Sequence, residues 1–443
     1  MLKTFSIGGI HPSENKLSAQ RPIEAIAIPQ QVIIPLGQHL GAPSEALVQK
    51  GDRVKVGQVI AKPSGFVSAS IHSPVSGTVE KVEEIADASG YKRKAIVIKT
   101  EGDEWEETID RSSDLKKEIV LAPADIIKKI AEAGIVGMGG ATFPTHIKLS
   151  PPPGKKCEVL IINGVECEPY LTADHRVMLE KGEEVMVGIS ILMKALQVDK
   201  AIIGIENNKP DAIAHLTKIA ASYKGISVLP LKVQYPQGGE KQLIDACIGR
   251  QVPSGKLPIE TGAVVQNIGT AFAIYEAVQK NKPLIERVVT VTGKSLSKPG
   301  NFLARIGTPI STLIEAAGGL PEDTGKIIGG GPMMGKALSS TDSAVTKGSS
   351  GILLMPKEES ERQPMQNCIR CAKCVAVCPM GLSPYLVMTL SQKAIWDRAE
   401  EERIMDCIEC GSCNFTCPST RPILDYVRLG KAKVGMIIRS RTK

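Results

Sequence analysis

The sequence lacks the features that would export it or anchor it in a membrane. The opening segment, MLKTFSIGGIHPSENK, has no apolar core of the kind found in a secretory signal. No uninterrupted apolar run reaches the roughly 18 residues that a membrane span needs. The best candidate, residues 185–193, stops at Lys194. We therefore expect the chain itself to be cytoplasmic and not to span a membrane.

Aromatic residues and histidines are also scarce. Aromatics make up 3 % of the chain, and the six histidines are scattered. None of them lies in a motif typical of a catalytic triad. We expect all of them to be structural: His11, His39, His72, His146, His175 and His215. We assign no catalytic acid, base or nucleophile.

Charge is concentrated at one end of the chain. Of the net charge of +7, residues 421–443 supply seven Lys or Arg against one Asp, which leaves about +1 for the rest. A nearly neutral body argues against nucleic acid as a partner. We expect residues 426–443 to form a solvated, frayed basic tail; the alternative is a weak contact with anionic lipid or an acidic partner subunit.

Cysteines, in contrast, are dense near the C-terminus. Eight of the eleven lie in two runs that both read C-x2-C-x2-C-x3-C-P. In a reducing cytoplasm this density indicates metal rather than disulfides. Zinc suits two CxxC pairs that lie far apart, whereas here a third cysteine follows after only two residues. The spacing is typical of bacterial ferredoxins with two [4Fe–4S] clusters, in which the fourth ligand crosses over from the other run.

That crossing rule predicts two ligand sets. The first is Cys368, Cys371, Cys374 and Cys417, and the second is Cys407, Cys410, Cys413 and Cys378. Between the runs, the segment from Ser383 to Asp406 has a cap-like serine and no interior glycine, so we expect helix and a helical ferredoxin module. The isolated Cys157, Cys167 and Cys247 are expected to be small buried hydrophobes.

The N-terminal part reads as a small β-sandwich. Residues 48–61 and 69–82 alternate apolar and polar side chains around GD and SG turns. They resemble the two halves of a biotinyl or lipoyl carrier domain. The turn KPSGFVSAS lacks the motif that frames the modified lysine of such carriers, and Lys62 comes too early. We therefore expect a structural or docking role rather than a swinging arm.

From about residue 122, helical and strand patterns alternate, which predicts a parallel α/β sheet with ligands at the carboxyl ends of its strands. The loop GMGGATFPTHIK (137–148) places Gly137, Gly139 and Gly140 before Lys148. Glycines let backbone amides approach a phosphate, and the lysine can meet its charge. The loop matches neither GxGxxG nor a P-loop, so plain turns are the alternative.

Four segments of this region resemble motifs of the NADH- and FMN-binding subunit of respiratory complex I. They are GIVGMGGATFPTHIK, NGVECEPY, YPQGGEKQL and QNIGTAFAIYEA, in that order. The resemblance implies FMN and NAD(H) contacts from Gly137, Gly139, Gly140, Phe143, Lys148, Asn163, Glu166, Glu168, Gly239, Glu240, Asn267 and Thr270. Val165, Tyr170 and Lys241 depart from the family pattern of aspartate, glycine and glutamate. An empty structural copy of the fold is the alternative.

Short strands, one amphipathic helix and a glycine cluster predict a β-grasp module in residues 285–338. Gly329–Gly331 are expected to be tight turns, and Met333 and Met334 to be packing residues. Residues 339–362, rich in Ser, Thr, Glu and Lys, read as a linker.

The whole order of modules resembles the C subunit of the ion-translocating Rnf electron-transport complex. The expected organisation is multidomain α/β and β: a barrel-sandwich hybrid (1–120), a Rossmann-like FMN/NADH domain (121–284), the β-grasp module (285–338), the linker (339–362), a double [4Fe–4S] ferredoxin domain (363–425) and the basic tail (426–443). The resemblance implies an oxidoreductase subunit that relays electrons between NAD(H) and ferredoxin through FMN and two clusters. It also implies a peripheral position on the cytoplasmic face of the inner membrane, beside an iron–sulfur subunit and integral membrane subunits.

Three alternatives stay open at this point. One is a cobalamin reductase of bacterial microcompartments, which has similar modules. Another is a free soluble NADH dehydrogenase. The third is a non-enzymatic relay or scaffold subunit that has clusters but no flavin.

Overall fold

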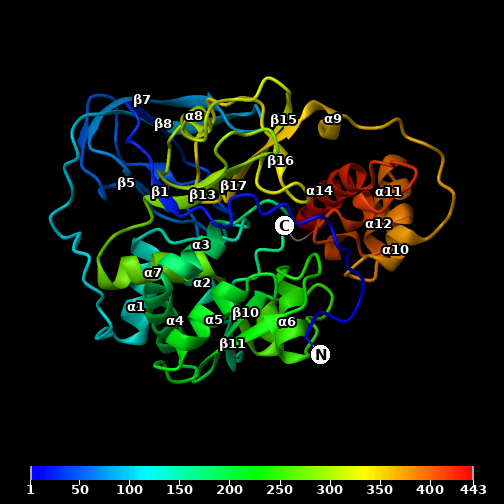
Figure 1. Cartoon of the computed structure of the whole chain (residues 1–443), viewed down its shortest axis with the longest axis horizontal. Helices are drawn as coiled ribbons and strands as arrows, with labels where there is room; N and C mark the ends of the chain where they lie inside the picture. The colour runs from blue at the N-terminus through cyan, green and yellow to red at the C-terminus, as the bar shows by residue number, and fades with distance from the viewer. Residues whose placement is uncertain (1, 442–443) are drawn as a thin grey trace.

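The computed structural model describes residues 2–441 and arranges them in four packed parts. Figure 1 shows two β-rich parts side by side at the top, an α/β part below them, and a helical part at the right-hand end. No helix among the described residues is long and apolar enough to cross a membrane.

The first part is a sandwich of two small antiparallel sheets. One has the order β2-β8-β7-β4 and the other β3-β5-β6. The strands are β2 (Gln31–Pro35), β3 (Glu45–Ala46), β4 (Arg53–Val54), β5 (Val59–Lys62), β6 (Ile71–His72), β7 (Gly77–Ala86) and β8 (Lys92–Thr100). Val32 and Ile34 of β2 are fully buried, as are Ile96 and Ile98 opposite them on β8, so alternate residues of β2 pack into the core.

The α/β part is built on a parallel sheet of order β11-β10-β9-β12. Its strands are β9 (Val159–Asn163), β10 (Ala201–Glu206), β11 (Ile226–Leu231) and β12 (Ala263–Asn267). Its helices are α1 (Pro123–Glu132), α2 (Thr145–Lys148), α3 (Ala173–Glu180), α4 (Gly182–Leu196), α5 (Pro210–Ala220), α6 (Glu240–Ile248) and α7 (Ile268–Gln279), with a short 3-10 turn at Pro258–Thr261. The strand order reverses between β9 and β12, so the carboxyl ends of these two strands frame the crevice where ligands of such sheets bind.

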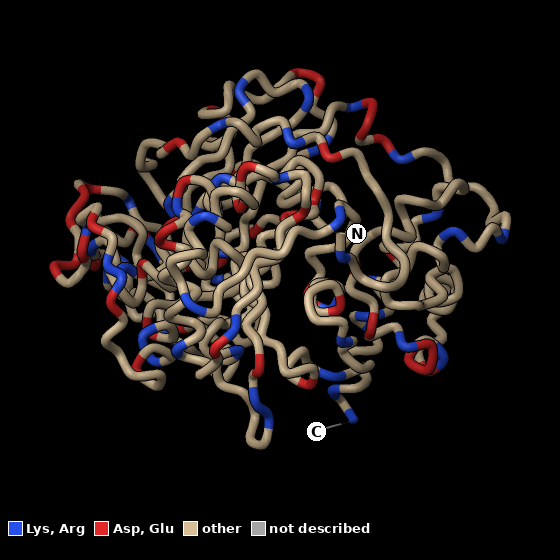
Figure 2. Tube along the Cα trace, turned by 60° about the horizontal axis from the view of Figure 1, so that its bottom comes forward, with Lys and Arg blue, Asp and Glu red and all other residues tan. Residues whose placement is uncertain are grey.

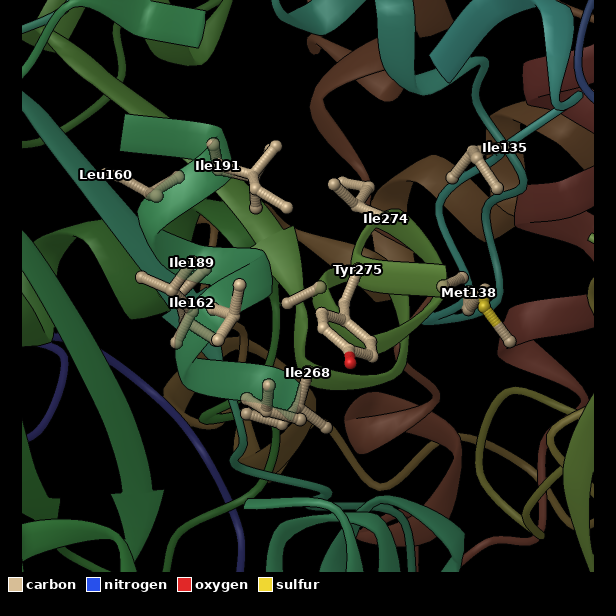
Figure 3. Close-up of a cluster of buried hydrophobic side chains, with 14 of the residues drawn as sticks. Ile135, Met138, Leu160, Ile162, Ile189, Ile191, Ile268, Ile274 and Tyr275 are labelled. Atoms are coloured by element: carbon tan, nitrogen blue, oxygen red, sulfur yellow. The ribbon is translucent and has the colours of Figure 1, made fainter. Parts of the chain in front are cut away.

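A large apolar core fixes the helices of this part to its sheet. Figure 3 shows Leu160 and Ile162 of β9 facing Ile189 and Ile191 of α4, with Ile274 of α7 nearby. All five side chains are fully buried. Fully burying a side chain of this size contributes about 1.5–3 kcal/mol, so the crevice is built on a rigid base.

The third part is a mixed sheet of order β1-β14-β13-β17-β15-β16 with helix α8 (Ile310–Ala316). Its strands are β1 (Ile23–Ala25), β13 (Glu286–Thr292), β14 (Gly300–Arg305), β15 (Thr324–Gly329), β16 (Lys336–Ala337) and β17 (Gly351–Pro356). The expectation of a linker at 339–362 is wrong, because β17 lies inside the sheet between β13 and β15. The apolar run Ile352–Leu354 is buried there. Because polar residues flank this short run, the composition of the whole segment did not indicate a strand.

The helical part carries both cysteine runs. It contains α10 (Lys373–Ala376), α11 (Pro384–Gln392), α12 (Trp396–Glu401), a 3-10 turn (Ile404–Asp406), α13 (Ser412–Phe415) and α14 (Ile423–Arg441), and α9 (Lys357–Ser360) precedes it. The segment between the runs is helical as predicted, although Ala394, with φ of 56°, divides it into two helices. Ser383 occupies the cap position without a side-chain capping bond.

The expected frayed tail is instead a helix that packs on this module. Val427 and Val434 of α14 are buried against α11, in a cluster with Val387 and Met388. Figure 2 shows basic and acidic residues alternating over most of the molecule, with basic residues at the end of α14. Part of the basic charge is paired: Arg441 lies 2.8 Å from Glu400. The apolar residues among these lysines and arginines recur at helical spacing, which indicates a packed helix. The prediction of a solvated tail considered only the net charge.

Residues 2–21, here called the N-terminal strap, connect the α/β part to the helical part. Lys3 forms a parallel bridge with Leu231, and Ile10 forms an antiparallel bridge with Tyr235. Further along, the Gly9 amide donates to the Val377 carbonyl, 2.9 Å away. Figure 1 shows the strap running from below α6 up past the helical part. The strap therefore holds the cysteine module next to the carboxyl ends of the parallel strands.

Candidate functional site

The second predicted ligand set surrounds one buried cavity. Cys378 from the first run lines this cavity together with Cys407, Cys410 and Cys413 from the second run. The remaining lining is largely apolar: Pro379, Met380, Leu382, Pro384, Val387, Ile408, Leu424 and Val427, with Gly411 and Ser412. The fold thus brings the fourth cysteine of one run to the first three of the other.

The chemistry of this cavity fits an iron–sulfur cluster. The Leu382 amide donates to the Cys378 sulfur at 3.4 Å, and the Glu409 amide donates to the Cys407 sulfur at the same distance. Burial raises the pKa of Cys407 to about 11, so its thiolate needs a cation such as iron beside it. Across residues 2–441, no three His, Cys, Asp or Glu side chains gather closely enough for a single metal ion. The four cysteines line a common space, as the ligands of a cubane do.

The first predicted set lies at the surface. Cys368 and Cys371 are exposed, while Cys374 and Cys417 are partly buried. Cys374 and Cys417, from different runs, pack against the same apolar cluster of the helical part, and burial raises the pKa of Cys374. The two sets therefore differ in access: the second has two buried and two partly buried cysteines and is here called the enclosed set, whereas the first has two exposed cysteines.

Residues 137–143, here called the glycine hairpin, form the lip of the crevice. The Gly137 amide donates to the Phe143 carbonyl at 2.9 Å, and the Thr142 amide donates to the Gly137 carbonyl at 3.2 Å. Gly140 has φ of +107°, a backbone conformation that other residues rarely adopt. Within the described part of the chain, the amides of Gly139, Gly140 and Ala141 donate to no protein acceptor. Consecutive free amides at a glycine turn form a cradle suited to a phosphate.

Asn267 and Thr270 hold the hairpin from behind. The Met138 amide donates to the Thr270 hydroxyl at 2.9 Å. Asn267 caps α7 by accepting from the Gly269 amide at 2.8 Å. Its side-chain amide donates to Asp174 at 2.7 Å. Asp174 was not predicted, because no motif marks it; burial and the nearby Glu166 raise its pKa to about 7.

Lys148, Asn163 and Glu240 meet at the carboxyl ends of β9 and β12. The Lys148 ammonium lies 2.5 Å from a Glu240 oxygen and 3.2 Å from the Val265 carbonyl. Asn163 donates to the Gly238 carbonyl at 2.9 Å, which holds the loop that leads through Gly239 into α6. Each of these predicted residues lies at the crevice, where the strand order reverses.

The two predicted glutamates have different surroundings. The Glu166 carboxylate accepts from the amides of Asp174 and His175 at the start of α3. The Glu168 carboxylate accepts from the amides of Met333 and Met334, at 3.0 and 2.8 Å. Glu168 therefore binds the loop between β15 and β16, next to the cysteine module, rather than the glycine hairpin.

Tyr235 connects the crevice loops to the buried cavity. Its hydroxyl donates to the Cys410 carbonyl at 2.8 Å and lies 3.3 Å from Glu168. Close by, the Gln242 side chain donates to the Pro379 carbonyl at 3.2 Å. Both residues lie in the YPQGGEKQL motif, but their contacts are long-range and the sequence does not show them. The α/β part thus touches the enclosed cysteine set directly.

The strap adds a buried lysine to this region. The Lys16 ammonium donates to the carbonyls of Glu166, Glu168 and Leu171, at 2.8, 2.9 and 2.7 Å. Burial, with Lys209 nearby, lowers its pKa to about 8. Lys16 therefore holds the whole NGVECEPY loop in place, a role that the sequence did not indicate.

Family models and relatives agree on the modules of this chain. Four models match in order: the RnfC barrel sandwich hybrid domain at residues 3–103, the Nuo51 FMN-binding domain at 130–276, the SLBB domain at 288–337 and a 4Fe-4S dicluster domain at 360–418. The chain is 49 % identical to the C subunit of the proton-translocating ferredoxin:NAD(+) oxidoreductase complex from Clostridium ljungdahlii, over 91 % of this chain and 87 % of that protein. It is 46 % identical to the Na(+)-translocating counterpart from Acetobacterium woodii, over 96 % of both.

A solved structure supports the fold alone. The crystal structure of an NAD+-reducing [NiFe]-hydrogenase in the H2-reduced state aligns over 72 % of this chain and 63 % of that chain, with a TM-score of 0.51 and 18 % identity.

Proposed function

Since the chain belongs to the family of C subunits of Rnf ion-translocating oxidoreductase complexes, we propose that it relays electrons between NAD(H) and ferredoxin within such a complex. The observation that carries the proposal is the direct contact between two sites. Tyr235 lies on a loop of the FMN-binding part, and its hydroxyl bonds the backbone of Cys410 in the enclosed cysteine set. A donor site and an acceptor site are thus adjacent within one chain.

The eight cysteines hold two [4Fe–4S] clusters in this proposal. The enclosed cavity with Cys378, Cys407, Cys410 and Cys413 supports one ligand set, and the surface group with Cys368, Cys371, Cys374 and Cys417 supports the other. Each cluster carries one electron at a time. The amides that donate to sulfur would stabilise the reduced, more negative state of the enclosed cluster.

FMN would bind in the crevice between the carboxyl ends of β9 and β12. The free amides of the glycine hairpin would bind its phosphate, and Lys148, which is paired with Glu240, would add a positive charge to the crevice. Asn163, Glu166, Gly239, Glu240, Asn267 and Thr270 shape the crevice or hold its loops. When bound, FMN accepts two electrons as a hydride and releases them singly.

The protein residues supply position rather than acid–base chemistry. Thr270 and Asn267 fix the hairpin, and Tyr235 fixes the cavity wall against the crevice loops. Apolar lining keeps water from the enclosed cluster, while the exposed set gives electrons a way out of the chain. The net direction of flow follows the potentials of the external donor and acceptor.

The chain acts as a subunit of a larger complex in this proposal. Its relatives are named as subunits of complexes, and no helix within residues 2–441 could span a membrane. We place it at the cytoplasmic face of the inner membrane, held by integral membrane subunits. The exposed cysteine set would exchange electrons with an iron–sulfur subunit.

NAD+ reduction by reduced methyl viologen tests the relay on the isolated chain. The anaerobically reconstituted protein should form NADH, followed at 340 nm, and omission of FMN should abolish the reaction. A chain that carries its full iron but binds no flavin and forms no NADH would contradict the proposal and favour a flavin-free relay.

A further inference from the structure

The barrel-sandwich part touches the glycine hairpin directly. The amide of Leu40, on the loop between β2 and β3, donates to the Thr142 carbonyl at 3.2 Å. On another side of the hairpin, a Cβ at Gly348 would come within 2.6 Å of the Thr142 methyl. The hairpin is therefore bounded by the barrel-sandwich as well as by its own sheet.

Two loops of the barrel-sandwich are locked together at this contact. The Ala42 amide donates to the Val67 carbonyl at 2.9 Å, and a Cβ at Gly41 would collide with Val67. The buried His39 side chain bonds Ser68 and the Ala42 carbonyl. The paired loops, residues 39–43 and 64–68, are here called the sandwich lip. Such bonding holds the lip rigid next to the hairpin.

The sandwich lip presents large apolar side chains to solvent. Phe66 is 84 % exposed and Leu40 is 57 % exposed, in a protein with only six phenylalanines. A single exposed apolar residue needs no explanation, but two on adjoining rigid loops form a patch. The patch lies next to the glycine hairpin, because the Leu40 amide bonds the Thr142 carbonyl, and Phe143 at the end of that hairpin is only partly buried. The hairpin amides are assigned to the FMN phosphate, so the apolar and aromatic side chains of the patch are the part of this edge that suits a base, which stacks on such side chains.

We propose that the sandwich lip binds the adenosine end of NAD(H), with Phe66 and Leu40 extending the contact assigned to Phe143. The inference rests on the proposed NAD(H) function and adds the part of the site that contacts the adenine. The lip carries the exposed aromatic ring of Phe66, on which every base can stack.

ADP-ribose, which lacks the nicotinamide, tests the lip by isothermal titration calorimetry. Phe66→Ser and Leu40→Ser should each weaken ADP-ribose binding, by roughly tenfold for the aromatic residue. Tyr91→Ser is the matched control, since Tyr91 is 67 % exposed on the remote turn between β7 and β8. All three variants should keep wild-type iron and flavin content, because the side chains face solvent.

Kinetics with two donors separate the lip from the flavin site. Phe66→Ser should raise KM for NADH and leave kcat unchanged, while KM for reduced nicotinamide mononucleotide, which has no adenosine, should not move. Equal ADP-ribose affinity in Phe66→Ser and Tyr91→Ser overturns the proposal, and so does an equal loss with both donors. If wild-type protein oxidises NADH and the lip variants behave like the Tyr91→Ser control, the role of the lip is refuted and the proposed function stands. Wild-type protein that neither oxidises NADH nor binds ADP-ribose refutes the proposed function as well.

Discussion

Replacing Gly140 by alanine separates the phosphate cradle from ordinary backbone strain. Gly140 has φ of +107°, and a Cβ added there would meet no atom within 4 Å. The cost to folding is therefore backbone strain alone, about 1–3 kcal/mol. Gly154 offers a matched control, since it also has positive φ, +79°, and open space around its Cβ. Both substitutions should lower the free energy of unfolding by similar amounts.

Only Gly140→Ala should weaken FMN binding. Alanine disfavours the positive φ of the turn that aligns the free amides of Gly139, Gly140 and Ala141. One lost hydrogen bond to a charged phosphate costs about 1.5–3 kcal/mol, or roughly 10- to 150-fold in Kd. Titration of deflavinated protein with FMN, followed by flavin fluorescence, measures this difference. Equal FMN affinity in Gly140→Ala and Gly154→Ala would refute the cradle.

Three further variants test the rest of the account. Tyr235→Phe should lower the free energy of unfolding by about 1–3 kcal/mol, because the Cys410 carbonyl loses its donor; an unchanged denaturation midpoint would contradict the contact. Cys378→Ala should remove the enclosed cluster and reduce the iron content from about eight to about four per chain, whereas unchanged iron would overturn the crossed ligand sets. Burial lowers the pKa of Lys347 to about 7 from 10.5, so between these values the unfolded chain binds the additional proton. Wild-type stability should therefore rise with pH across that window relative to Lys347→Met, by a few kcal/mol, and parallel profiles would argue against it.

Local patterns in the sequence predicted the modules well, because each module depends on short-range spacing. The cysteine spacing predicted the cluster chemistry, and the family resemblance predicted the kinds of module; the matching family models confirm the barrel-sandwich, FMN-binding and dicluster modules. The helical segment between the runs was also predicted. Composition misled where polar residues surround a short apolar strand, as at β17, or where lysines share a helix with a buried stripe, as in α14.

Contacts between modules could not be predicted, because they join residues far apart in the chain. Lys16 donates to three carbonyls more than a hundred residues away, and the Tyr235 hydroxyl donates to the carbonyl of Cys410. Glu168 was predicted as a cofactor residue from its motif, yet its carboxylate is held by the amides of Met333 and Met334. A motif identifies which loop serves the site, but only the packed structure shows where each side chain turns.

Metal and flavin content of the anaerobically purified chain, followed by NADH addition, tests the central claim most directly. The account predicts about eight irons and one FMN per chain, and loss of the flavin absorbance when NADH is added. Zinc at the eight cysteines, or bound flavin that stays oxidised in excess NADH, would contradict it.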